Sequence, residues 1–164
     1  MVSIKDIPAE VRWEIATRSA SSMPLVYDMI FRGAFGDKVD ELETAFWVES
    51  GKEAKKIANY LVLPTRDARE IDDALGIISE TLLGPEFKSE VLESRPEKVT
   101  ERLTGCPMLN RLREMGMDLT TAMDHCGAYC SNAVTSMNPS YALEFTKGMC
   151  AGDPSCEYTI ELKK

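Results

Sequence analysis

The chain has 164 residues, of which 44% are hydrophobic and 28% charged, so it is long enough for one domain with its own apolar core. No apolar run approaches the roughly 18 residues of a membrane-spanning helix, and the N-terminus does not resemble a signal peptide. The net charge of −8 argues against nucleic acid as a partner. Five cysteines, an odd number, fit free thiols in a reducing compartment. We therefore expect a cytoplasmic protein that binds neither membrane nor nucleic acid.

The first half of the chain has the apolar spacing of helices. Four segments show it, separated by turn residues at Gly33, Gly36, Pro64 and Gly84; they are residues 8–22, 23–35, 38–63 and 65–84. The sequence therefore predicts a helical part that ends at residue 84.

The second half combines strands with two further helices. Alternating segments predict strands at 87–94, 98–105, 141–150 and 156–163. The helices lie between the two strand pairs. We expect an α+β fold in a single domain, 1–164, with a helical N-terminal half (1–84) and, in the C-terminal half (85–164), an antiparallel sheet with two inserted helices.

The register of the last two strands follows from their apolar residues. Pairing Leu143 with Leu162 and Phe145 with Ile160 gives one continuous apolar face. This register also sets Met149 opposite Cys156 and leaves Cys150 on the other face. It therefore predicts that Cys150 and Cys156 form no disulfide.

The first inserted helix is predicted over residues 107–116, with Pro107 at its start and Gly116 as its stop. Cys106 would then be the N-cap, where free amide groups and the helix dipole stabilise a thiolate. This makes Cys106 the best candidate nucleophile, with a lowered thiol pKa. The alternative is a cysteine that only packs as a small apolar residue.

The second inserted helix is predicted from about Leu119 to Met137, and its apolar stripe contains Cys126 and Cys130. His125, the only histidine, lies beside this stripe, about 100° around the helix. It is either a base for a neighbouring thiol or a half-buried histidine next to two core cysteines. Gly127 in mid-helix indicates close approach of another backbone, a ligand, or a kink.

Two family resemblances involve the second half of the chain. The stretch "ERLTGCPMLNRLREMGMDLTTAMDHCGAYC" and the final hairpin resemble the L-2-amino-thiazoline-4-carboxylic acid hydrolase-like family. The ending "GMCAGDPSCEYTI" is similar to ligand-binding domains named after vinyl reductases. The resemblance implies a cysteine-bearing pocket between sheet and helices, with Cys106 and Cys126 at the hydrolase family's positions. In the hydrolase-like family an acidic residue commonly follows the helix cysteine by a few positions, whereas here that region reads Gly127, Ala128 and Tyr129.

Three functions therefore compete. A hydrolase opening a cyclic C–N bond of a thiazoline-like substrate would use Cys106 or Cys126 as nucleophile, with His125 as base or orienting group and Glu101 as a second acid or base. Glu101 alternates with Val99 and Leu103 on one strand face, where a carboxylate would be desolvated. The favoured alternative is that this face is solvated and Glu101 is a surface charge. A non-catalytic domain would instead bind or sense a small ligand. In both readings, the candidate ligand-binding residues are Glu101, Tyr129 and Cys130.

The third function is a thiolate-bound metal or an iron–sulfur cluster. Its ligands would be Cys106, Cys126, Cys130 and Cys156. Cys126 and Cys130 lie one helical turn apart, but their spacing differs from the usual C-x₂-C knuckle. The sequence leaves the cofactor unknown and a homo-oligomer open, and it predicts a small molecule as the partner.

Overall fold

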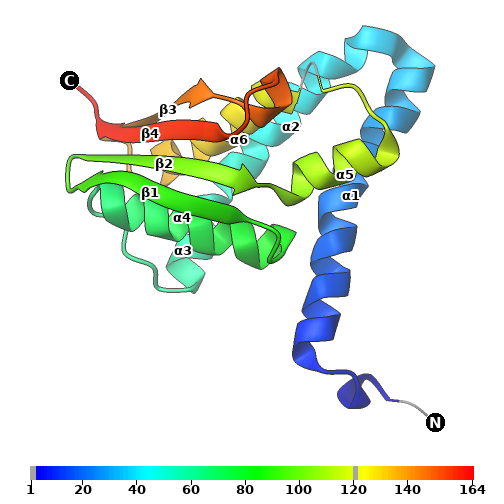
Figure 1. The fold of residues 1–164 in the computed structure, drawn as a ribbon, viewed down its shortest axis with the longest axis horizontal. Coiled ribbons are helices and arrows are strands. Elements are labelled where there is room, and N and C mark those ends of the chain that lie inside the picture. The colour runs from blue at the N-terminus through cyan, green and yellow to red at the C-terminus, as the bar shows by residue number, and fades with distance from the viewer. Residues whose placement is uncertain (1–2, 120–121) are drawn as a thin grey trace.

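The computed structural model describes residues 3–119 and 122–164 and has the predicted α+β architecture. Its helical half precedes the sheet, and α5 and α6 are inserted between the strand pairs (Figure 1). The main elements are α1 (Ala9–Phe35), α2 (Val39–Lys52), α3 (Ala54–Tyr60), α4 (Ala68–Leu83), β1 (Lys88–Arg95), β2 (Lys98–Gly105), α5 (Pro107–Met115), α6 (Ala122–Met137), β3 (Tyr141–Lys147) and β4 (Cys156–Leu162).

The four strands form one antiparallel sheet in the order β1-β2-β4-β3. Helices α4 and α6 cover one face, as Figure 1 shows, and the other face carries polar side chains. On that outer face, Arg102 forms ion pairs with Glu90 and Glu157, each at 2.8 Å. A sheet with one covered face requires the alternation that the sequence shows.

Helix α1 is longer than the sequence pattern predicts. It continues through Gly33, where a break was expected, and ends at Gly36. The prediction at Gly33 is wrong because an isolated glycine in an exposed helix costs only about 1 kcal/mol. The N-terminal part of α1 extends away from the sheet (Figure 1).

The β3–β4 register differs from the prediction by two residues. Leu143 pairs with Ile160 and Phe145 with Tyr158, where the sequence favoured Ile160 opposite Phe145. The inner face is the predicted one, because a shift of two residues preserves which side chains point inward. The ladder is irregular between Phe145 and Lys147, so strand alternation does not continue to Cys150.

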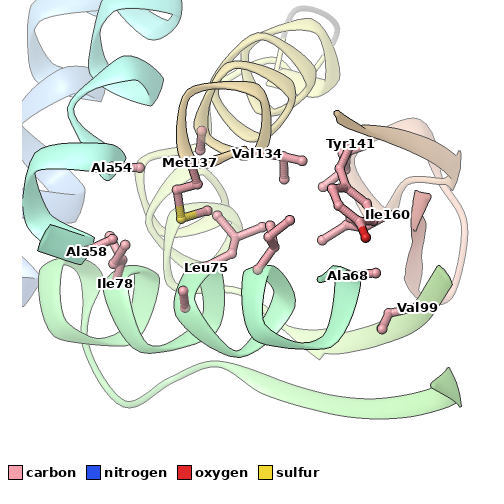
Figure 2. Close-up of a cluster of buried hydrophobic side chains, with 14 of the residues drawn as sticks. Ala54, Ala58, Ala68, Leu75, Ile78, Val99, Val134, Met137, Tyr141 and Ile160 are labelled. Atoms are coloured by element: carbon pink, nitrogen blue, oxygen red, sulfur yellow. The ribbon is translucent and has the colours of Figure 1, made fainter. Parts of the chain in front are cut away.

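The core lies between α4, α6 and the inner face of the sheet. Asp67 caps the start of α4 by accepting hydrogen bonds from the amides of Arg69 and Glu70, both at 3.0 Å. The helix then buries an apolar stripe against α6 and the strands (Figure 2); the labelled residues are Ala54, Ala58, Ala68, Leu75, Ile78, Val99, Val134, Met137, Tyr141 and Ile160. This packing holds α6 and its cysteines above the sheet.

Candidate functional site

A cavity of about 990 Å³ lies beside this core. Its wall includes residues of all the helices from α1 to α6 and of all four strands. Most of the lining is apolar, and its exposed aromatic members lie on α1 and α2; they are Tyr27, Phe31, Phe35 and Phe46. The volume is in the range of small-molecule sites in proteins, and the cavity opens to solvent between these helices.

All five cysteines border this cavity, and all are free thiols. Cys126 and Cys130 project from α6, Cys106 is the N-cap of α5, and Cys156 begins β4. The sequence analysis correctly predicted that these four cysteines lie close together. The prediction that Cys150 lies at the end of a strand is wrong. Strand β3 ends at Lys147, and Cys150 belongs to the short 3-10 helix Met149–Ala151.

The thiols are held in the protonated state. Burial raises the pKa of Cys130 to about 12 and that of Cys150 to about 11, and it raises the pKa of Cys126 and Cys156 as well. For Cys106 the lowered pKa expected from its N-cap position is wrong. Burial raises its pKa, and the amides of Leu109 and Met108 oppose this only in part.

His125 faces α2 at the cavity wall. Its ring stacks on Trp47 with 6.2 Å between ring centroids, and its Nε2 lies 3.6 Å from Oε2 of Glu43. Burial lowers the pKa of His125 and raises that of Glu43 to about 7. Among the described residues, no hydrogen bond joins His125 to a cysteine, so the structure does not show it as the base of a thiol.

An arginine balances the acidic groups on this side of the cavity. The Nη2 atom of Arg32 lies 2.8 Å from Asp28, 2.7 Å from Asp40 and 3.3 Å from Glu43. Hydrogen bonds to Asp40 and Asp28 raise the pKa of Arg32, so the guanidinium stays charged. This cluster therefore contains its own countercharge.

Tyr129 and Gly127 lie close together on α6 but have different surroundings. Tyr129 lines the cavity and packs edge-on against Trp47 at 6.4 Å between centroids; burial raises the pKa of its hydroxyl to about 12. A β-carbon at Gly127 would meet no atom within 4 Å. Of the three explanations for Gly127, the close approach of another backbone is therefore wrong; such an approach occurs at Gly51 of α2 instead.

Glu101 points into the covered side of the sheet and lines the cavity. The hydroxyl of Tyr158 is within hydrogen-bond distance of Oε2 of Glu101 and 2.8 Å from Oδ1 of Asp72 on α4. Burial and the neighbouring Glu101 raise the pKa of Asp72 to about 7. The solvent-facing alternative for Glu101 is therefore wrong.

Sequence reasoning missed Asp72 and Tyr158, although the pattern contained a signal for one of them. Asp72 lies on the buried stripe of α4, four residues after Ala68 and three before Leu75. A charged residue on an apolar stripe indicates a buried polar contact. Its partners come from the sheet, so periodicity along α4 could not identify them.

The described residues do not form a metal site in this structure. Within residues 3–119 and 122–164, no group of three or more His, Cys, Asp or Glu side chains could hold a metal ion. The predicted ligands Cys106, Cys126, Cys130 and Cys156 thus share a cavity without a coordinating arrangement. In the same described ranges, no helix is both long and apolar enough to cross a bilayer.

Comparison with solved structures identifies the fold of this chain in other proteins. The trafficking protein particle complex subunit 3 from Naegleria fowleri, covalently bound to palmitic acid, matches with a TM-score of 0.60 and 9% identity over 92% of this chain and 96% of that one. The phenol-responsive sensory domain of the transcription activator PoxR with phenol matches with 0.58 and 10% identity, over 87% and 74%. At these identities the likeness shows a shared fold alone. No family model matches the sequence, and no curated protein matches it significantly.

Proposed function

We propose that this protein binds a small, mainly apolar molecule in the cavity between α1, α2, α4, α6 and the sheet. The observation that carries the proposal is the cavity itself, with its volume of about 990 Å³ and its predominantly apolar wall. Apolar side chains supply the transfer free energy of binding, and a few inward polar groups orient the ligand.

Two further observations support a binding role. The two similar structures named above each contain a small molecule, palmitic acid in one and phenol in the other. The raised pKa of each cavity thiol keeps it neutral, so these cysteines add soft apolar surface to the wall. A wall of this kind favours recognition over nucleophilic attack.

Tryptophan fluorescence tests the proposal directly. Trp47 lines the cavity, and Trp13 donates its indole N–H to the carbonyl of Thr81 outside it. In a Trp13→Phe background, phenol and decan-1-ol should change the Trp47 emission saturably. A Ser79→Phe substitution, which places a ring on the cavity wall, should weaken binding at least about tenfold.

Ser19→Phe is the matched control for this variant. Ser19 is an exposed helical serine that does not line the cavity, so its replacement should leave the affinity unchanged. Equal loss of binding in both variants, or no saturable signal with any ligand, contradicts the proposal.

Thiol-dependent hydrolysis is the second candidate, in line with the resemblance to the thiazoline hydrolase-like family. The observation that favours it is the position of Cys106 at the start of α5, where the amides of Leu109 and Met108 act to lower its pKa. Loss of thiazoline ring absorbance tests this activity. The rate should vanish in Cys106→Ser and persist in Cys150→Ser.

A further inference from the structure

The two acidic clusters of the cavity differ in their countercharge. The cluster around Glu43 contains Arg32, whereas Asp72 and Glu101 form no ion pair with any lysine, arginine or histidine in the part of the chain that the structure describes. Asp72 is only 6% exposed. A buried carboxylate without a cation is destabilising unless a further group compensates it.

Hydrogen counting fixes the charge of this second cluster. Tyr158 has one hydroxyl proton, so it can donate to only one of the two carboxyl groups at a time. The hydrogen bond between Tyr158 and the remaining carboxyl group therefore needs that carboxyl group to be protonated, so that it donates to the phenol oxygen. With one carboxyl proton, the cluster of Asp72, Glu101 and Tyr158 holds one net negative charge, and loss of that proton adds a second, so the cluster is negative in both states.

This charge faces the cavity. Glu101 and Tyr158 are cavity-lining residues, and Asp72 lies behind them on α4. The ring of Phe145 packs edge-on against Tyr158 at 5.7 Å between centroids, and Leu103 follows Glu101 on the same strand face. These apolar neighbours lower the local dielectric constant, which strengthens attraction to an incoming positive charge.

The rest of the wall has the same sign. Arg32 balances Asp28 and Glu43 on this wall, and Lys56 pairs with Glu53. The other carboxyl groups that line the cavity are Glu80, Glu101 and Asp118, against Lys38. Within the described part of the chain, no arginine lines this wall. The nearby Arg32 is already paired with Asp28, Asp40 and Glu43, so its guanidinium is not available to bind a carboxylate in the cavity.

We propose that the ligand is an amphiphilic amine, whose apolar body fills the cavity and whose ammonium group pairs with Glu101. This inference rests on the proposed binding function and names its ligand class. The cavity defines the binding site, and the unbalanced carboxyl pair defines the charge of the ligand. A fatty acid would instead place a second negative charge beside Glu101.

Three ligands that differ only in their polar group test this inference. Decylamine, decan-1-ol and decanoate are titrated at pH 7.5, below their micelle concentrations, into the Trp13→Phe protein with Trp47 fluorescence as the signal. We expect the amine to bind about tenfold more tightly than the alcohol, because a charge-assisted hydrogen bond is stronger than a neutral one; tenfold corresponds to about 1.4 kcal/mol. Decanoate should bind more weakly than the alcohol.

A pair of glutamate variants identifies the anchoring residue. Glu101→Gln should weaken amine binding about tenfold and leave alcohol binding within about twofold. Glu144→Gln, on the exposed face of β3, which is separated from β2 by β4, should change neither. The comparison of the three ligands needs no variant of the carboxyl cluster, so it remains decisive if Glu101→Gln does not fold.

The outcomes separate this inference from the proposed function. Equal affinities for amine and alcohol, tighter binding of decanoate, or an unchanged amine affinity in Glu101→Gln overturns the ligand class while the cavity remains a binding site. Binding of none of the three ligands overturns both proposals.

Discussion

Gly51 of α2 packs directly on the backbone of Tyr129 in α6, and a β-carbon at position 51 would collide with the Tyr129 carbonyl oxygen. The hydroxyl of Ser136 donates to the carbonyl of Gly51 at 3.5 Å in the same contact. This close crossing of α2 and α6 brings Trp47 beside His125 and Tyr129. The aromatic wall of the cavity therefore depends on a glycine.

Replacing Gly51 with alanine should destabilise the protein. The new methyl group meets backbone atoms, which cannot rotate away, so the helices must separate at a cost of about 1–3 kcal/mol. Thermal unfolding should show a lower Tm. Gly33→Ala in α1, where a β-carbon meets no atom within 4 Å, should instead raise the free energy of unfolding by up to about 1 kcal/mol. Equal effects of the two substitutions contradict the helix-crossing argument.

Asp72 should make stability depend on pH. Burial raises the pKa of its carboxyl group to about 7, against about 4 in an unfolded chain. Between these values the folded protein holds a proton that the unfolded chain releases. Stability should therefore decrease as pH rises from about 4 to 7 and level off above that.

Asp72→Asn removes this contribution and isolates it. Relative to the unchanged protein, the variant should gain on the order of 3 kcal/mol of unfolding free energy between pH 4.5 and 8, measured by denaturant titration at each pH. The raised pKa of Glu43 is common to both proteins and cancels in the difference. A difference that does not change with pH would show that Asp72 is ionised throughout.

Alkylation should be slow at every cysteine of the folded protein. Burial raises the pKa of Cys106, Cys126 and Cys130, and only the thiolate reacts. Iodoacetamide at pH 8, followed by mass spectrometry, should label the denatured chain at least about tenfold faster than the native one. A native cysteine that reacts as fast as in the denatured chain contradicts the assigned protonation state.

The Cys156 sulfur should stabilise the turn between β3 and β4. It accepts a hydrogen bond from the buried amide of Met149 at 3.2 Å, so Cys156→Ala leaves that amide without its partner at a cost of about 1–3 kcal/mol. Cys156→Ser retains an acceptor and should lose less. Chemical denaturation of both variants measures the difference, and equal losses would indicate that packing alone matters.

The non-reduced protein should contain five free thiols, with none engaged in a Cys150–Cys156 disulfide. Thiol titration of the denatured, non-reduced chain measures this number. A count of three, with mass mapping that joins Cys150 to Cys156, would contradict the structure.

The sequence by itself determined the α+β class, the strand positions and the inner face of the hairpin. These depend on periodicity, which is local in the chain. The same periodicity placed Cys126 and Cys130 on the inner side of α6, and Pro107 and Gly116 marked the ends of α5. The length of the chain indicated an apolar core of its own, and the odd number of cysteines indicated free thiols.

Only the tertiary structure decided the chemistry of the cavity. Cys106 has the predicted N-cap position, yet burial by distant elements raises its pKa. Asp72 and Glu101 are 29 positions apart in the numbering and meet through Tyr158, from a third element. Protonation states depend on desolvation and on neighbours brought together by folding, and one-dimensional spacing contains neither.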